Sequence, residues 1–273
     1  MAKQRLDTLL VEQGFLPTRE KAKTTIMAGL VFVANQRVDK PGALVPVDAE
    51  IRVQGAAIPY VSRGGLKLAK AIQAFSLSLM DKVVLDIGAS TGGFTDCALQ
   101  EGATRVFAVD VGYGQLAWKL RQDPRVVSLE RTNIRYLEAD KLDAVPDLAT
   151  IDASFISLTL VLPKATELIR PGGEIVALIK PQFEAGRDKV GKKGVVRSPQ
   201  VHIEVIEKVI AFAESLGLQV VGLDFSPITG PEGNIEYLLY LRTPGEATPI
   251  QDSNRDSWSQ VISGMVRSAH SSL

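Results

Sequence analysis

Short apolar runs alternate with amphipathic segments from about residue 66 to residue 241, and this alternation constrains the fold more than any other feature of the chain. The apolar runs predict strands at Val83–Ile87, Val106–Val109, Val126–Leu129, Leu148–Ile151, Ile175–Ile179, Val220–Phe225 and Ile235–Leu241. The amphipathic segments predict helices at Leu66–Phe75, Phe94–Gln100, Leu116–Arg121, Leu158–Leu168 and His202–Leu216. Strands that are separated by helices form a mostly parallel sheet with helices packed on its faces.

The connection between the last two predicted strands determines how the sheet ends. Ser226–Asn234 is rich in Pro and Gly and shows no helical pattern, so it cannot form a parallel crossover. We therefore expect the last strand to pair antiparallel. The predicted fold class is α/β, with a Rossmann-like sheet that is mostly parallel and has an antiparallel last strand.

The residues ahead of this sheet predict a small α+β domain. Leu6, Leu9 and Leu10 have helical spacing, and Thr18 is suited to cap a second helix before short strand-like pieces begin. The predicted organisation is a small domain at residues 1–59, a large domain at residues 60–245 and a C-terminal tail at residues 246–273 with a helix near Trp258–Val266.

Charge and residue counts exclude several classes of protein. The chain carries 31 Lys and Arg against 31 Asp and Glu, so a nucleic-acid partner can be inferred only from local clusters of charge. The single cysteine, Cys97, excludes a disulfide framework, and with only two histidines no metal site is expected. The N-terminus lacks the apolar core of a signal peptide, and no stretch reaches the ~18 apolar residues that span a bilayer. We therefore expect a cytoplasmic protein.

Two clusters of basic residues are candidates for binding RNA. One surrounds the predicted second helix of the small domain, and the other lies in a glycine-rich loop after Lys180 that we expect to close on RNA. Helices and loops that present Arg and Lys commonly bind phosphates, although a solvated surface explains the same charges. The candidates are Arg5, Arg19, Lys21, Lys23 and Arg63, together with Arg187, Lys189, Lys192 and Lys193 in the loop.

A glycine-rich turn joins the first predicted strand of the large domain to a helix. Glycines let the backbone approach a ligand closely, and the helix offers free N–H groups. The spacing differs from the dinucleotide G-x-G-x-x-G pattern, and a second carboxylate, Asp110, ends the next strand, where it suits ribose hydroxyls. A tight turn without a ligand is the alternative. The cofactor-binding candidates are Asp86, Gly88, Ser90, Gly92, Gly93, Phe94, Asp110 and, near an adenine, Asn133.

Four charged residues lie where packing does not explain them. Asp152 and Lys180 follow predicted strands, Lys67 opens a helix, and Glu236 lies inside an apolar strand. Ligands of such sheets bind at the carboxyl ends of the strands. These four residues are therefore our catalytic candidates.

The order Lys67, Asp152, Lys180, Glu236 resembles the Lys-Asp-Lys-Glu tetrad of FtsJ-like ribose 2′-O-methyltransferases. The motifs around it are VSRGG at 61–65, DIGASTGGFT at 86–95, DVGYGQL at 110–116, ERTN at 130–133, SFISL at 154–158 and KPQFE at 180–184. Together they resemble the TlyA family, also called the hemolysin A or YqxC type, from about Arg5 to Thr243. The resemblance implies an S4 RNA-binding domain, S-adenosylmethionine as cofactor, and methylation of cytidine ribose in 16S rRNA, 23S rRNA or both, with ribosomal RNA or ribosomal subunits as partners.

The chemistry of a ribose 2′-hydroxyl agrees with these residues. The hydroxyl must lose a proton, and Lys180 can accept it only if its pKa falls, which crowding by Lys67 and partial desolvation would both favour. Asp152 and Glu236 would orient the ammonium groups, and much of the acceleration would come from holding the reacting atoms in line.

Two other classes of function remain as alternatives. One is a ribosome-assembly factor that binds RNA without transferring a methyl group. The other is a hemolysin, which only the family's name suggests.

Overall fold

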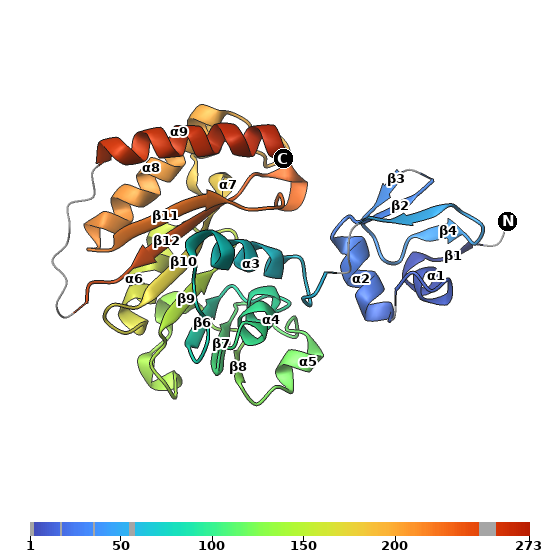
Figure 1. The fold of residues 1–273 in the computed structure, drawn as a ribbon, viewed down its shortest axis with the longest axis horizontal. Helices are drawn as coiled ribbons and strands as arrows, with labels where there is room; N and C mark the ends of the chain where they lie inside the picture. The colour runs from blue at the N-terminus through green and yellow to red at the C-terminus, as the bar shows by residue number, and fades with distance from the viewer. Residues whose placement is uncertain (1–2, 17, 35, 55–57, 246–254) are drawn as a thin grey trace. The chain divides into compact units, whose positions relative to one another are not determined.

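The computed structural model describes residues 3–16, 18–34, 36–54, 58–245 and 255–273 (Figure 1). The chain divides into two compact units, Met1–Gly65 and Leu66–Leu273, each with its own hydrophobic core.

The first unit consists of two helices and short strands. The helices are α1 (Leu6–Glu12) and α2 (Arg19–Met27), and the strands are β1 (Lys3–Arg5), β2 (Val31–Val33), β3 (Gln36–Val38), β4 (Leu44–Pro46) and β5 (Ile51–Val53). β1 pairs with β4, and β2 lies between β3 and β5, all antiparallel. The side chain of Thr18 accepts a hydrogen bond from Lys21 N at 3.2 Å, so the predicted cap of α2 is confirmed. Strands of three residues are too short to show a periodic pattern, and the sequence did not reveal β1, β3 or β4.

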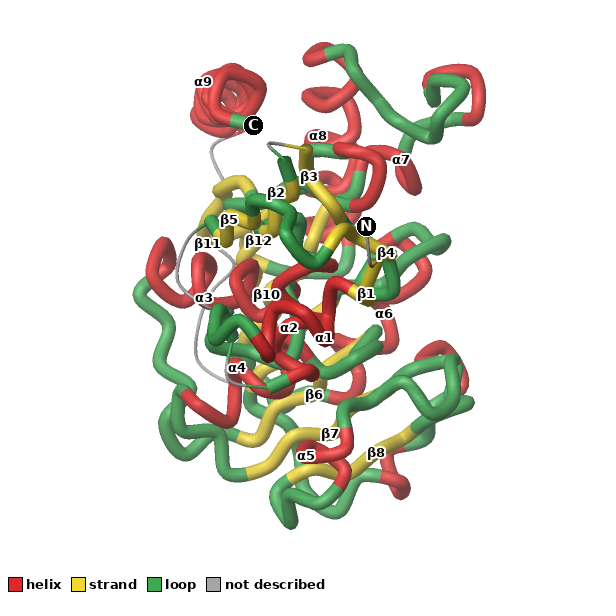
Figure 2. Tube along the Cα trace, turned by 90° about the vertical axis from the view of Figure 1, so that its right-hand side faces the viewer, coloured by secondary structure: helices red, strands yellow, loops and turns green. Residues whose placement is uncertain are grey.

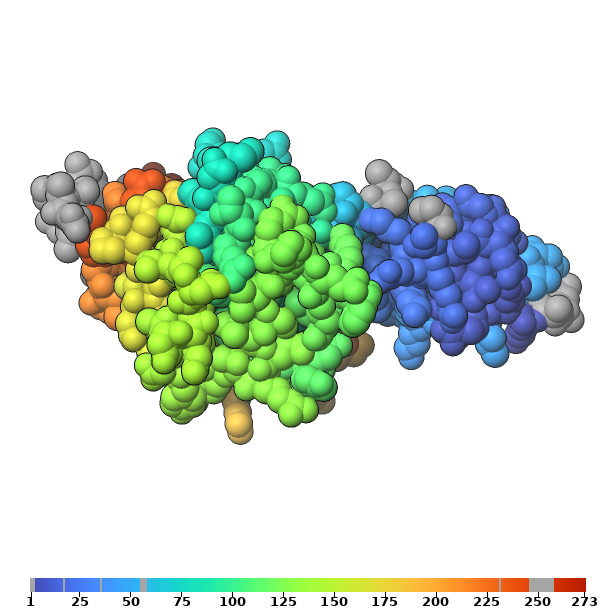
Figure 3. All heavy atoms as spheres, turned by 90° about the horizontal axis from the view of Figure 1, so that it is seen from below, coloured from blue at the N-terminus to red at the C-terminus, as the bar shows by residue number. Residues whose placement is uncertain are grey.

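The second unit contains a seven-stranded sheet in the order β11-β12-β10-β9-β6-β7-β8. Its strands are β6 (Val83–Ile87), β7 (Arg105–Val109), β8 (Val126–Leu129), β9 (Leu148–Ile151), β10 (Glu174–Ile179), β11 (Gln219–Phe225) and β12 (Tyr237–Arg242). β6 to β10 are parallel, and β12 runs antiparallel to both of its neighbours, as predicted. Figure 2 shows β6, β7 and β8 side by side, and the segments that follow β7 and β8, green in Figure 3, form much of the surface seen there.

The order of strands reverses between β6 and β9, because the chain builds outward from β6 to β8 on one side and from β9 to β10 on the other. Such a reversal opens a crevice at the carboxyl ends of the strands. The fold therefore places a ligand site where the segments after β6 and β9 diverge.

Helices cover both faces of the sheet. They are α3 (Gly64–Phe75), α4 (Gly93–Gln100), α5 (Trp118–Arg121), α6 (Leu158–Leu168), α7 (Pro181–Glu184), α8 (Pro199–Ser215) and α9 (Arg255–Ser272), with short 3₁₀ turns η1 (Ile134–Tyr136), η2 (Ala139–Lys141), η3 (Arg187–Lys189) and η4 (Pro231–Gly233). One face forms a single core with α6, α8 and α9. On the other face Phe75 of α3 stacks on Tyr240 of β12, with 5.4 Å between ring centroids. Burial on both faces explains why the strands read as continuous apolar runs.

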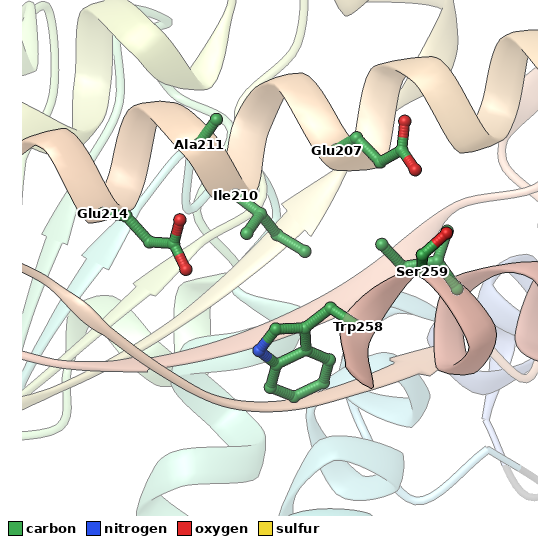
Figure 4. Close-up of a pocket in the computed structure, with 7 residues that line it drawn as sticks. Glu207, Ile210, Ala211, Glu214, Trp258 and Ser259 are labelled. Atoms are coloured by element: carbon green, nitrogen blue, oxygen red, sulfur yellow. The ribbon is translucent and has the colours of Figure 1, made fainter. Parts of the chain in front are cut away.

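The C-terminal segment contains a longer helix than the sequence suggested. The predicted helix near Trp258–Val266 lies inside α9, which packs against α8 and β11. Figure 4 shows a pocket between the two helices, lined by Glu207, Ile210, Ala211, Glu214, Trp258, Ser259 and Ile262. In the described part of the chain, no helix has the length and apolar character needed to cross a membrane.

Candidate active site

Four charged side chains that are distant in the sequence meet at the carboxyl ends of the central strands. Lys67 of α3 places its Nζ 2.6 Å from Glu236 Oε2 and 3.3 Å from Asp152 Oδ2. The other carboxylate oxygen of Asp152, Oδ1, lies 2.5 Å from Lys180 Nζ. The structure thus brings together all four members of the expected tetrad, as a chain of alternating charge that runs Glu236–Lys67–Asp152–Lys180.

The sequence predicts that Glu236 lies inside a strand, and this prediction is wrong. Glu236 immediately precedes β12, which begins at Tyr237, although its backbone carbonyl still accepts a hydrogen bond from Ser226 N at 2.9 Å. The apolar run begins at Ile235, but regular pairing with β10 begins two residues later. This position lets the carboxylate turn toward Lys67 instead of into the core.

Burial makes the pairing within the tetrad obligatory. The side chain of Glu236 is 1% exposed, those of Lys67 and Lys180 are 7% exposed, and that of Asp152 is 19% exposed. Charges withdrawn from water are tolerated only when they are paired and hydrogen-bonded. The two carboxylates and two ammonium groups are paired, with N–O distances between 2.5 and 3.3 Å.

The electrostatics fix the protonation state of Lys67. Burial lowers the pKa of Lys67, but the charges and hydrogen bonds of Asp152 and Glu236 outweigh it, and the pKa is raised. Lys67 therefore stays protonated and cannot accept a proton. The sequence suggested direct crowding of Lys180 by Lys67, whereas the structure places the Asp152 carboxylate between the two ammonium groups.

Lys180 has further contacts with the segment after β9. Its Nζ donates to Ser154 Oγ at 3.1 Å and reaches the backbone carbonyl of Asp152 at 3.5 Å. Pro181 follows at the first turn of α7, so the chain bends immediately after the lysine. The ammonium group is therefore fixed by side chains and backbone of one neighbouring segment.

Two glycines make room for the tetrad. A Cβ at Gly88 would lie 2.7 Å from the carbonyl oxygen of Asp152, and Gly88 has a φ of +84°, which side chains rarely adopt. A Cβ at Gly230 would lie 2.3 Å from Glu236 Oε1. Gly88 was expected from the sequence as part of the glycine-rich turn. Gly230 was not, because only the fold brings it to Glu236.

The glycine-rich turn closes on the second predicted carboxylate. Asp110, after β7, accepts hydrogen bonds from Ser90 N at 2.8 Å and from Gly112 N at 2.6 Å. Gly92, with a φ of +92°, is the N-cap of α4. Ser90, Gly92 and Asp110 thus lie together at the carboxyl ends of β6 and β7, at the N-terminus of α4.

Other cofactor candidates lie below or beside this turn. Gly93 and Phe94 are buried at the start of α4, with Phe94 3% exposed. Asn133 lies after β8, where its side chain accepts a hydrogen bond from Arg135 N at 3.1 Å and caps η1. Phe94 therefore packs beneath the turn, whereas Asn133 lies beyond the carboxyl end of β8, the strand after β6 and β7 in the sheet.

Asp86 is fully buried under the turn. Its carboxylate accepts hydrogen bonds from Thr95 Oγ1 at 2.6 Å and Thr150 Oγ1 at 3.1 Å. Burial raises the pKa of Asp86 to about 7, against the lowering effect of the two threonines and with a smaller raising effect of Asp152. The residue supports the turn from within the sheet and presents no surface in this structure.

An aromatic pair beside Lys180 was not expected from the sequence. Phe155 is 90% exposed with a φ of +63°, and its ring lies 5.1 Å from that of Phe183, measured between centroids. An exposed bulky residue in left-handed backbone is unusual, and such strain clusters at functional sites. In the sequence, each phenylalanine stands three positions after a catalytic candidate, Phe155 after Asp152 and Phe183 after Lys180.

The basic candidates of the first unit are partly engaged in internal contacts. Asp7 is buried, and its carboxylate accepts two hydrogen bonds of 3.0 Å from Arg5 and one of 2.9 Å from Arg19. These hydrogen bonds lower the pKa of Asp7 to about 2. Lys21 donates to the carbonyl of Ile58, and Lys23 is exposed. The side chains of Arg5 and Arg19 remain 47% and 53% exposed, so Asp7 fixes two guanidinium groups that stay accessible. Arg63 is half-buried just ahead of α3.

The basic loop after α7 is exposed but fastened at its far end. Arg187, Lys192 and Lys193 are exposed, and Lys189 lies 2.5 Å from Glu204 of α8. After the loop, Val196 N donates to Asn234 Oδ1 at 3.2 Å, and Val196 O accepts from His202 Nε2 at 2.9 Å. The loop is thereby tied to α8 and to the residues just before Glu236.

Known proteins resemble the two units separately and together. Residues 60–243 match the family of FtsJ-like methyltransferases, and residues 4–51 match the S4 domain. YqxC of Bacillus subtilis (strain 168), which carries a provisional name as an rRNA methyltransferase, is 55% identical over 99% of this chain and 95% of its own length. The 16S/23S rRNA (cytidine-2′-O)-methyltransferase TlyA of Mycobacterium tuberculosis (strain H37Rv) is 44% identical over 95% of this chain and 97% of its own length.

A solved structure also resembles the chain over its whole length. It is a protein of Streptococcus thermophilus, provisionally named a hemolysin, with a TM-score of 0.76 and 48% identity over 100% of this chain and 97% of that one. These similarities extend over both units.

Proposed function

Since this chain belongs to the TlyA family of S4-containing, FtsJ-like methyltransferases, we propose that it transfers a methyl group from S-adenosylmethionine to the ribose 2′-hydroxyl of cytidine in ribosomal RNA. The observation that carries the proposal is the buried chain of charges Glu236–Lys67–Asp152–Lys180. A positioned lysine in such a chain can take a proton from a hydroxyl group, and TlyA of M. tuberculosis bears the name of this reaction.

The residues of the turn fit the proposed cofactor. S-adenosylmethionine supplies a methyl group on a positively charged sulfur. Gly88 and Gly92 shape the turn, because a side chain there would collide with Asp152 or Leu120, and the Asp110 carboxylate suits ribose hydroxyls. We assign Gly88, Ser90, Gly92 and Asp110 to direct contact, Asn133 to the adenine end, and Asp86, Gly93 and Phe94 to support of the turn.

The tetrad divides the reaction between its members. Lys180 is paired with Asp152 in this structure, so it would first release a proton to solvent; it would then accept the proton of the 2′-hydroxyl as the methyl group that S-adenosylmethionine supplies passes to the ribose oxygen. The proton then leaves Lys180 for solvent. Lys67 stays charged, holds Asp152 from the other side, and is itself held by Glu236. Fixing these groups before the substrate arrives avoids reorganisation during the reaction.

Transfer of a labelled methyl group tests the proposed function. Wild-type protein with methyl-labelled S-adenosylmethionine is expected to label purified 16S or 23S rRNA, free or within ribosomal subunits, and the labelled position should resist alkaline cleavage because the 2′-hydroxyl is blocked. Mapping the label identifies the nucleotide. Label on a base instead of a ribose, or labelling only of nucleic acids other than rRNA, would contradict the proposal.

The first unit, including its basic residues, is proposed to bind ribosomal RNA, and the loop with Arg187, Lys189, Lys192 and Lys193 to contact RNA near the reacting ribose. Phosphate contacts fix the register of a protein on RNA without reading its sequence. Binding of RNA by Met1–Gly65 leaves the chemistry to the second unit.

Replacing Arg19, Lys21 and Lys23 together by alanine is expected to weaken binding of rRNA. Each lost phosphate contact should reduce the slope of log K against log salt by about one. Filter binding at several salt concentrations measures this slope, and calorimetry should show unchanged affinity for S-adenosylmethionine. Arg125→Ala, at the opposite end of β8 from the site, is the control. An unchanged salt slope in the triple variant would remove these residues from the RNA surface.

A further inference from the structure

Two segments that follow neighbouring strands carry the catalytic candidates, and three contacts join them. The first segment, 152–158, follows β9, and the second, 180–184, follows β10. Lys180 contacts Asp152 and Ser154 at one end. The rings of Phe155 and Phe183 meet in the middle. We call segments 152–158 and 180–184 together the catalytic pair of segments.

Glu184 makes the third contact, at the end remote from Lys180. Its Oε2 accepts a hydrogen bond from Ser157 Oγ at 2.7 Å, and its Oε1 accepts one from Leu158 N at 2.6 Å. Glu184 is 6% exposed, so water does not replace these bonds. Lys208 of α8 donates to the backbone carbonyl of Glu184 at 3.1 Å and fixes it from a third side.

The environment of Glu184 shows how its buried charge is tolerated. No salt bridge involving Glu184 is found among the described residues. Its carboxylate instead meets the N-terminus of α6, where Ser157 is the N-cap and Leu158 the first helical residue. Free N–H groups and the helix dipole stabilise a negative charge there. Glu184 thus ties the start of α6 to the second segment.

The strained residue lies between the tied points. Phe155 keeps a φ of +63° although it is 90% exposed, and its ring contacts that of Phe183 in the second segment. Strained backbone persists only when its surroundings determine it. Here the surroundings are the contacts of Lys180 on one side of Phe155 and those of Glu184 on the other. If either set of contacts were lost, the backbone at Phe155 would be free to relax.

We propose that Glu184 is a positioning residue for the methyl transfer: it holds the catalytic pair of segments in the register that aims Lys180 and orders Phe155. This inference rests on the proposed function. Glu184 acts through Ser157 and Leu158 and touches neither substrate nor cofactor. A shift of about 1 Å in such a constellation can cost on the order of 10²-fold in rate.

Two substitutions of Glu184 show whether its hydrogen bonds or its negative charge position the segments. Glu184→Ala removes both bonds, and kcat is expected to fall tenfold or more while the dissociation constant of S-adenosylmethionine stays unchanged. Glu184→Gln keeps an acceptor for Leu158 N, and its amide can donate to Ser157 Oγ, which also contacts Thr159 Oγ1 at 2.8 Å. It should stay within about threefold of wild type. Glu167→Ala, an exposed glutamate later on α6, is the matched control.

Amide hydrogen exchange gives a readout that does not depend on turnover. Exchange across residues 154–158 is expected to accelerate in Glu184→Ala and to remain at the wild-type rate in Glu184→Gln and Glu167→Ala. If the alanine variant does not fold, Ser157→Ala removes one of the two bonds and should show a smaller loss of kcat with the same direction of exchange. Wild-type kcat in Glu184→Ala, or a Gln variant as slow as the Ala variant, would overturn the inference. A wild-type protein that does not methylate rRNA would instead refute the proposed function, and the exchange experiment would still decide whether Glu184 holds the segments.

Discussion

Replacing Lys180 by alanine or by arginine is expected to lower the single-turnover rate of methyl transfer by about 10³-fold or more, with folding and cofactor affinity preserved. General-base catalysis contributes roughly 10² to 10⁴-fold. Arginine keeps the positive charge beside Asp152 but cannot lose its proton, so it tests proton transfer separately from charge. Lys70→Ala, also a lysine bonded to a carboxylate, Asp224, is the control.

The remaining members of the tetrad should behave as one unit with Lys180. Lys67→Ala, Asp152→Ala and Glu236→Ala are each expected to lose most activity, because each removes a partner from a buried chain of charges. Losses in double variants should be much smaller than the sum of the single losses, as for residues that act together. Additive losses, or wild-type turnover in Lys180→Arg, would be incompatible with Lys180 as the base.

Asp86→Asn is expected to stabilise the cofactor-free protein at pH 8 and to change its stability little near pH 4. Burial raises the pKa of Asp86 to about 7, from 3.8 for a free side chain. The folded state therefore binds the proton more tightly than the unfolded chain between these values. The contribution of Asp86 to stability is fully present below about pH 4 and is lost as the pH rises to about 7.

The size of this effect follows from the shift. About three pKa units correspond to an upper limit of about 4 kcal/mol, which the asparagine variant should recover in part above pH 7. Urea unfolding at pH 5 and pH 8 measures the difference between Asp86→Asn and wild type. Asp143→Asn, which replaces an exposed carboxylate, should show no such dependence on pH. A variant that is destabilised equally at both pH values would show that Asp86 is needed as an ordinary hydrogen-bond acceptor, not tolerated as a buried acid.

A protein that accepts this loss of stability at neutral pH keeps the carboxylate for another reason. Asp86 lies beneath the glycine-rich turn and within electrostatic reach of Asp152. Perturbed pKa values cluster at functional sites, and this carboxyl lies in β6, beneath the glycine-rich turn that borders the crevice. We therefore expect Asp86→Asn to weaken binding of S-adenosylmethionine even as it stabilises the empty protein.

The sequence by itself determined the α/β class, the antiparallel last strand and the glycine-rich turn, and it predicted the four residues of the tetrad. These features are local: a strand buried on both faces reads as an apolar run, and a sharp turn needs glycine where φ is positive. Family resemblance supplied the function, because the motifs around Lys67, Asp152, Lys180 and Glu236 are short and ordered. The sequence predicts the ends of strands less well, because hydrogen-bond pairing with the neighbouring strand decides where a strand begins. Glu236, for example, lies just before β12 and not in it.

Only the tertiary structure decided which side chains meet. Asp7 joins Arg5 to Arg19, Asp152 lies between two lysines, and Asp86, a cofactor-binding candidate, is buried beneath the glycine-rich turn. Phe155 and Glu184 lie in the motifs SFISL and KPQFE, but a motif does not show which residues its side chains contact. The roles of Phe155 and Glu184 depend on contacts between two segments that neighbouring strands bring side by side, and on the directions in which the side chains leave the backbone. No local pattern records either, because both are set by how the parallel strands β9 and β10 pair.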